Sequence, residues 1–126
     1  MSLFTTLQIV DAMGVIVNDN VAMRTAFGVT LDGFQTLVAL YGRQDAPHSF
    51  LSTLSTTVSR LVVSHRDNQK RFVDAGILPR LVELGRDERH DSGDMHLTAV
   101  KAFLSLVDGQ FPLTIMPLYY LLCVTV

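Results

Sequence analysis

The chain has 126 residues, of which 48% are hydrophobic, and its ten basic and twelve acidic side chains leave a formal charge of −2. This hydrophobic share excludes intrinsic disorder as the general state, and the length suits one domain with its own core. Because phosphate binding requires a concentrated basic surface and the chain has no block of like charge, nucleic acid is not expected as the main ligand.

The chain contains one cysteine, Cys123, which excludes an internal disulfide and a metal site built on cysteines alone. A reducing compartment, and therefore a cytoplasmic location, is expected. The N-terminal stretch MSLFTTLQIVDAMG has no basic residue before its apolar run and is interrupted by Asp11. It therefore does not resemble a secretory signal.

Three segments align without gaps and indicate an internal repeat. Each reads as a helix that ends in a polar turn, and the turns at Asp19, Asp67 and Gly109 are 48 and 42 residues apart. Periods in this range are typical of two- and three-helix repeats, so we expect an all-α fold. The segments are IVDAMGVIVNDN (9–20), TVSRLVVSHRDN (57–68) and AVKAFLSLVDGQ (99–110).

The first repeat unit is the less regular one. A short helix is expected within VAMRTAFGVTLD, a region four residues longer than its counterpart in the second unit. GFQTLVALYG (33–42) then matches ILPRLVELGR (77–86), with Leu37 and Val38 at the positions of Leu81 and Val82. We therefore expect the first unit to repeat the helices of the second, with an insertion.

The second unit has clearer helix signals. Apolar residues recur at steps of three and four from about residue 48 to 65, which predicts one long helix. Asp67 or Asn68 is expected to cap a short helix through QKRFVDA, which Gly76 ends because glycine readily adopts the left-handed conformation. Pro79 suits the first turn of the next helix, where no amide donor is required. The expected buried residues are Leu51, Leu54, Val58, Leu61, Val62, Phe72, Val73, Ile77, Leu78, Leu81 and Val82.

The polar stretch RDERHDSGD is expected to form a loop after this unit. Ser92 or Asp94 can cap the helix that follows it. The expected buried edge of that helix comprises Leu97, Val100, Leu104 and Val107, with Phe103 beside them.

The stretch FVDAGILPRLVEL (72–84) resembles the armadillo repeat family. In that family a short helix ends in an acidic-Ala-Gly-Gly turn, and an Ile-Pro pair then opens a helix with a Leu-Val-x-Leu core. Asp74-Ala75-Gly76 and Pro79 match this pattern, whereas Ile77 stands where a second glycine is usual. The resemblance covers about residues 5–110. It implies a short armadillo- or HEAT-like right-handed α-solenoid of about two to two and a half repeats in residues 1–110, followed by an uncharged hydrophobic tail at 111–126.

The resemblance also implies a binding surface. Members of the family bind extended peptides or partner domains on a concave face lined by the third helix of each repeat. Those that bind nuclear-import signals carry Trp and Asn ladders there, but this chain has no Trp and no Asn at the matching positions, so we do not expect it to bind basic peptides of that kind. A different protein or peptide partner is expected. The positions form three rows: Gln8, Thr56 and Thr98; Asp11, Ser59 and Lys101; Val15, Val63 and Ser105.

Catalytic motifs are absent from the sequence. It contains no Gly-rich phosphate loop, no nucleophile elbow and no paired carboxylate motif, so neither enzyme activity nor a cofactor is expected. His65 could act as a base beside Ser64 or Asp67. A helix-terminal histidine near the last carbonyl groups is the commoner arrangement, because the helix dipole favours it there.

The segment HDSGDMH places four candidate metal ligands close together: His90, Asp91, Asp94 and His96. These residue types suit a divalent metal. A solvated loop whose Asp94 caps the next helix is the favoured interpretation, since no other Cys or His spacing supports a metal site. We therefore expect no bound metal.

The C-terminal segment, residues 110–126, carries no charged side chain. Pro112 and Pro117 interrupt it, it falls short of the roughly 20 residues that span a bilayer, and no basic cluster flanks it, so a membrane anchor is the less favoured alternative. The segment could instead cover the apolar end of the repeats, or mark an array that has been cut short. Its exposure would promote self-association.

Overall fold

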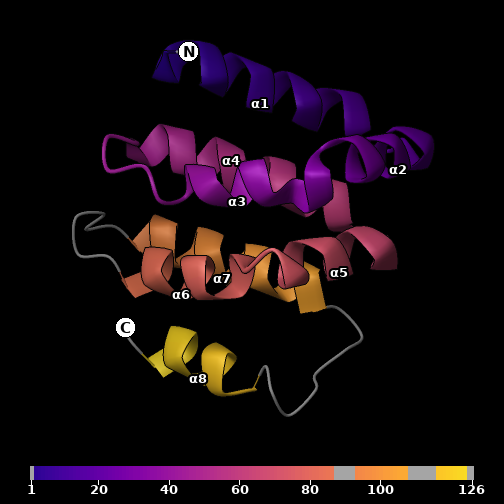
Figure 1. Cartoon of the computed structure of the whole chain (residues 1–126). Coiled ribbons are helices and arrows are strands. Elements are labelled where there is room, and N and C mark those ends of the chain that lie inside the picture. The colour runs from indigo at the N-terminus through magenta and orange to yellow at the C-terminus, as the bar shows by residue number, and fades with distance from the viewer. Residues whose placement is uncertain (1, 87–92, 108–115, 125–126) are drawn as a thin grey trace.

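The structure, a computed structural model, describes residues 2–86, 93–107 and 116–124 (Figure 1). Every regular element in these ranges is helical, which confirms the predicted all-α class. The helices are α1 (Leu3–Val17), α2 (Val21–Thr30), the 3-10 turn η1 (Asp32–Phe34), α3 (Gln35–Leu40), α4 (His48–Val62), α5 (Arg66–Asp74), α6 (Ile77–Arg86), α7 (Gly93–Val107) and α8 (Met116–Val124).

The helices lie in two layers (Figure 1). The long helices α1, α4 and α7 form one layer, in which α4 contacts both of the others. The shorter helices α2, α3, α5 and α6 form the second layer, and α8 packs against α6 and α7 at the C-terminal end of the stack. A single apolar core runs between the layers from α1 to α8.

The backbone geometry repeats every 45 residues. The three long helices begin at Leu3, His48 and Gly93, and each has 15 residues. Asp19 and Ser64, also 45 residues apart, both have left-handed backbones, with φ of 58° and 53°. The predicted spacings of 48 and 42 are therefore wrong for the middle segment, whose alignment is shifted by three residues. The outer two segments, 90 residues apart, were aligned in agreement with α1 and α7.

The middle segment was misaligned because the short helices that follow α1 and α4, namely α2 and α5, have N-caps of different residue types. Asn20 Oδ1 accepts a hydrogen bond from the amide of Met23 at 3.1 Å and caps α2. At the equivalent position His65 Nδ1 accepts from the amide of Asn68 at 3.2 Å and caps α5. The prediction that Asp67 or Asn68 caps this helix is therefore wrong, since both lie inside it.

The expected position of the His65 side chain, beside the last carbonyl groups of the preceding helix, is also wrong. Its Nδ1 serves the cap of α5, and its Nε2 lies 2.8 Å from Thr25 Oγ1. Because Nδ1 accepts, the ring proton is on Nε2 and can be donated to that hydroxyl. The Nε2 contact therefore joins α2 to the start of α5, while Nδ1 caps α5 itself.

The predicted core of α4, α5 and α6 is confirmed, with Val73 only half-buried. The prediction for α7 is partly wrong, because Leu97 and Leu104 are 49% and 39% exposed. Helix α7 packs against both α4 and α6, and small residues allow this close approach. Val107 and Phe103 are buried as expected, and Val100 is half-buried. The buried residues of α7 are Met95, Ala99, Ala102, Phe103, Leu106 and Val107.

The predicted four-residue insertion in the first unit is wrong, because the corrected register places 12 residues between Asn20 and Gly33 against 11 between His65 and Ile77. The turn into α3 is left-handed. Asp32, Gly33 and Phe34 have φ of 52°, 70° and 67°, whereas the second unit makes its turn with Gly76 alone, at φ 88°. Left-handed backbone is unfavourable for a residue with a side chain. At Phe34 the cost is offset by burial, because its ring stacks on that of Phe72 with centroids 4.0 Å apart and planes 4° apart.

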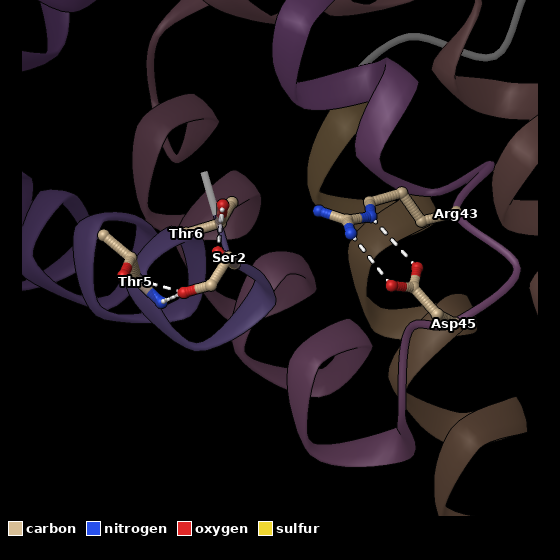
Figure 2. A network of polar contacts seen from close by, with 5 residues as sticks. All are labelled: Ser2, Thr5, Thr6, Arg43 and Asp45. Atoms are coloured by element: carbon tan, nitrogen blue, oxygen red, sulfur yellow. Dashed lines mark hydrogen bonds and ion pairs between the residues drawn. The ribbon is translucent and has the colours of Figure 1, made fainter.

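Two polar contacts at the surface fix segment ends (Figure 2). Ser2 Oγ accepts from the amide of Thr5 at 3.1 Å and caps α1. Between α3 and α4, the Arg43 guanidinium donates to both carboxylate oxygens of Asp45, at 3.0 and 2.9 Å. These hydrogen bonds lower the pKa of Asp45.

Equivalent buried side chains of α2 and α5 connect the ends of the long helices. Arg24 Nε donates to the carbonyl of the last residue of α1 and its Nη1 to the carbonyl of Val63, each at 3.2 Å. Gln69, 45 residues later, donates from Nε2 to the carbonyl of the last residue of α4 at 3.2 Å and to that of Ser105 at 3.1 Å. Each side chain is 6% exposed.

Asn68 makes a third buried connection. Its Nδ2 donates to the carbonyl groups of Arg24 and Leu61, both at 2.9 Å, and its Oδ1 accepts from Arg71 at 3.2 Å. The side chain is 0% exposed. Gly28 packs directly against this carboxamide, so that α2 and α5 approach closely.

Replacing Asn68 should therefore destabilise the fold. Asn68→Leu leaves two buried carbonyl groups without this donor, and we expect the free energy of unfolding to fall by about 2–4 kcal/mol. Gly28→Ala should act by the same route, because its methyl group would displace the carboxamide. Urea denaturation measures both. The exposed Lys70→Ala should change stability by less than about 0.5 kcal/mol. An equal loss in all three variants would contradict the assignment.

The described part of the tail is packed against the stack. Leu122 in α8 is 0% exposed, and the rings of Tyr119 and Phe103 lie 5.7 Å apart. Residues 116–124 pack on the C-terminal end of the stack, as expected for a segment that covers the apolar end of the repeats. No helix within the described ranges is long and apolar enough to cross a membrane.

Two adjacent leucines test this packing. Leu122→Ala removes a fully buried side chain and should lower the free energy of unfolding by about 2–4 kcal/mol, whereas Leu121→Ala, at a side chain that is 42% exposed, should cost less than about 1 kcal/mol. Thermal or urea denaturation measures the difference. Equal small effects would show that α8 does not cover the stack.

Candidate binding groove between α4 and α7

An open groove of about 490 Å³ lies between α4 and α7. Six of the nine predicted binding residues line it: Thr56, Ser59, Val63, Thr98, Lys101 and Ser105. The other three, Gln8, Asp11 and Val15, are exposed on α1 and do not line the groove. The structure therefore brings together the predicted residues of two repeats.

Two lining residues, Ser55 and Arg60, were missed from the sequence. The alignment error of three residues in α4 explains why Arg60 was missed. With the 45-residue repeat, the position equivalent to Val15 and Ser105 is Arg60 rather than Val63. Aligning the N-caps Asn20 and His65, which are 45 residues apart, gives the correct register. This alignment requires histidine to be recognised as a helix cap.

The groove combines hydroxyl groups with two cations. Arg60 of α4 and Lys101 of α7 are the charged members of its lining, and no carboxylate is among the lining residues that the structure describes. Neither side chain forms an ion pair or hydrogen bond within the part of the chain that the structure describes. The groove therefore has positive charge available for a ligand that carries carboxylates or phosphates, whereas the hydroxyl groups of Thr56 and Ser105 already donate to the carbonyl groups of Ser52 and Ala102.

Small side chains form the floor of the groove. Ser59 Oγ and Ser105 Oγ lie 3.3 Å apart across α4 and α7, and the Ser105 hydroxyl donates to the carbonyl of Ala102 at 2.8 Å. Ser55 Oγ lies 2.9 Å from the hydroxyl of Tyr41 behind the groove. With no large side chain on this floor, an extended backbone can lie close to the helices.

Tyr41 links the groove to α3. Burial raises the pKa of its hydroxyl well above the ordinary value, and the hydrogen bond with Ser55 offsets part of that rise. The hydroxyl is therefore protonated at neutral pH and can form its hydrogen bond with the hydroxyl of Ser55.

This contact predicts a pH dependence of stability. Because the folded chain holds the Tyr41 proton more tightly than the unfolded chain, its contribution is complete below the ordinary tyrosine pKa of about 10 and is lost as pH rises above it. At pH 7, Tyr41→Phe should be less stable than the wild type by about 1 kcal/mol. That difference should shrink at about pH 11, when followed by urea denaturation. A difference that stays constant would contradict the assignment.

Of the four candidate metal ligands, His90 and Asp91 lie outside the described residues. Asp94 is exposed in the first turn of α7 and is not the residue that precedes it. His96 Nδ1 lies 3.2 Å from the carbonyl oxygen of Gly85. Among the described residues, no group of three or more His, Cys, Asp or Glu is placed to hold a metal ion.

Comparison with known proteins gives no relative: no family model matches the chain, and no curated protein or solved structure is significantly similar to it. The armadillo resemblance thus rests on residues 72–84 and the repeat pattern, and stays a prediction.

Proposed function

We propose that the protein is a short armadillo-like α-solenoid that binds a partner protein, without catalysis, by holding an extended acidic peptide of that partner in the groove between α4 and α7. The observation that carries this proposal is that Arg60 and Lys101 line one groove and have no ion-pair or hydrogen-bond partner among the described residues. A cytoplasmic location, expected from the single cysteine, belongs to the same proposal.

The repeated geometry supports the solenoid part of the proposal. Three helices of equal length recur at 45 residues, and equivalent connectors, Arg24 and Gln69, bind equivalent carbonyl groups. Repeat proteins of this kind present successive helices side by side, which creates elongated surfaces suited to extended peptides. The groove lies between two such helices.

The lining chemistry supports an acidic ligand and binding without reaction. Arginine and lysine bind carboxylates and phosphates, and serine and threonine hydroxyls can donate to the same oxygen atoms. The lining residues that the structure describes include serine and threonine hydroxyls and Lys101, but no histidine, aspartate or glutamate that could act as general base to a hydroxyl. The groove is therefore suited to recognition.

Synthetic peptides test the proposal. Fluorescence anisotropy with labelled peptides of alternating Glu and Ser, or alternating Lys and Ser, should show binding of the acidic peptide only, with affinity that falls as salt is added. Arg60→Glu combined with Lys101→Glu should weaken binding at least about tenfold, since both attractions become repulsions.

A matched charge reversal provides the control. Lys70→Glu combined with Arg80→Glu changes the net charge equally at exposed residues of α5 and α6 that do not line the groove. This variant should bind as the wild type does. Equal weakening in the two double variants would mean that net charge alone attracts the peptide, and preference for the Lys-Ser peptide would overturn the proposal.

A further inference from the structure

Helix α1 exposes a face whose counterparts in the equivalent helices α4 and α7 are buried. The equivalent faces of α4 and α7 consist of residues that are at most 3% exposed: Phe50, Leu54, Thr57 and Leu61 in α4, and Met95, Ala99, Ala102 and Leu106 in α7. In α1 the same four positions, Thr5, Ile9, Ala12 and Ile16, are all exposed, Ile9 at 44% and Ile16 at 47%. We refer to these four residues as the α1 face.

Preceding helices cover this face in the other two repeats. In α4, the Thr57 hydroxyl donates to the carbonyl of Val10 in α1 at 3.0 Å. In α7, Ala99 lies next to Gly85 of α6. The α1 face has the position and apolar character of a helix interface, but nothing in the described structure covers it.

The neighbouring helix α2 exposes apolar residues at positions where the equivalent helix α5 carries charged ones. Four exposed or half-exposed positions of α5 carry charged side chains: Arg66, Asp67, Arg71 and Asp74. The equivalent residues of α2, also exposed, are Val21, Ala22, Ala26 and Val29. Val21 and Val29 are 63% and 66% exposed. The first repeat therefore has the surface chemistry of an interface, whereas the second has that of a solvated surface.

We infer that the α1 face binds the same face of a second copy of this chain, forming a two-fold symmetric dimer. Helix α8, which has 9 residues and exposes Tyr120 and Leu121, packs on the opposite end of the stack, so head-to-tail stacking would set the 15-residue α1 against a shorter surface of different shape. A two-fold pair covers both uncovered faces at once.

The sequence of α1 suits such a pair. In an antiparallel pair whose axis passes between Ala12 and Met13, Ile9 of one copy faces Ile16 of the other, with the small Ala12 near the axis. Asp11 is the only charged residue of α1 and lies outside the α1 face, so like charges are not brought together. The peptide groove involves α4 and α7 and remains open in this dimer.

Sedimentation velocity on the 126-residue chain tests the inference. At about 100 µM the wild type should have twice the mass of one chain and should dissociate on dilution. Ile9→Lys combined with Ile16→Lys should raise the dissociation constant of the dimer at least about tenfold, because it removes apolar contacts and adds like charges. Both side chains are substantially exposed in one chain, so circular dichroism should be unchanged.

Leu97→Lys combined with Leu104→Lys is the matched control, because it places two lysines at the same spacing on exposed positions of α7. This variant should dimerise as the wild type does. A monomeric wild type would overturn the inference, and so would a dimer that survives the α1 substitutions or one that is equally weakened by the α7 substitutions. None of these outcomes bears on peptide binding.

Discussion

The fold depends on satisfying the carbonyl groups at the C-terminal ends of the long helices. The last turn of a helix has no intrahelical donors for its carbonyl groups, and here those turns are buried among neighbouring helices. The carbonyl groups of Val17 and Val62 accept from the turn amides of Asn20 and His65 at 3.1 and 3.0 Å, and the side chains of Arg24 and Gln69 add a second, buried donor to each. Asn68 is the side-chain donor to the carbonyl of Leu61. Because Arg24 and Gln69 each also reach the end of the next long helix, they fix the packing of successive repeats along with the helix ends.

This constraint explains why the helices were predictable and the register was not. Apolar spacing and Gly76 located α4, α5 and α6 correctly, because those signals report which face is buried and where the chain turns. The repeat register depends on polar groups whose residue type changes between copies, such as Asn20 and His65 as caps or Arg24 and Gln69 as connectors. Matching residue types therefore aligned Asp67 with Asp19, although Ser64 is the equivalent position.

The candidate site was predictable to a similar extent. A face of a helix is robust to a shift of three residues, which is nearly one turn, so six predicted residues still meet in the groove. The same shift hid Arg60, the residue that together with Lys101 gives the groove its charge. Leu97 and Leu104 of α7 show the other limit: periodicity selected the large apolar residues, whereas close packing against α4 and α6 buries the small Ala99 and Ala102.

A buried side chain of α5 forms hydrogen bonds to both helices that line the groove. Ser105 faces the groove with its hydroxyl while its carbonyl accepts from Gln69, whose second hydrogen bond holds the last residue of α4. The two walls therefore share one buried pivot in α5, and they cannot spread apart there without lengthening one of these hydrogen bonds. These hydrogen bonds fix the width of the groove at this point. Under the proposed function, ligands would be selected by whether they fit this spacing, since changing it would require strain in α5.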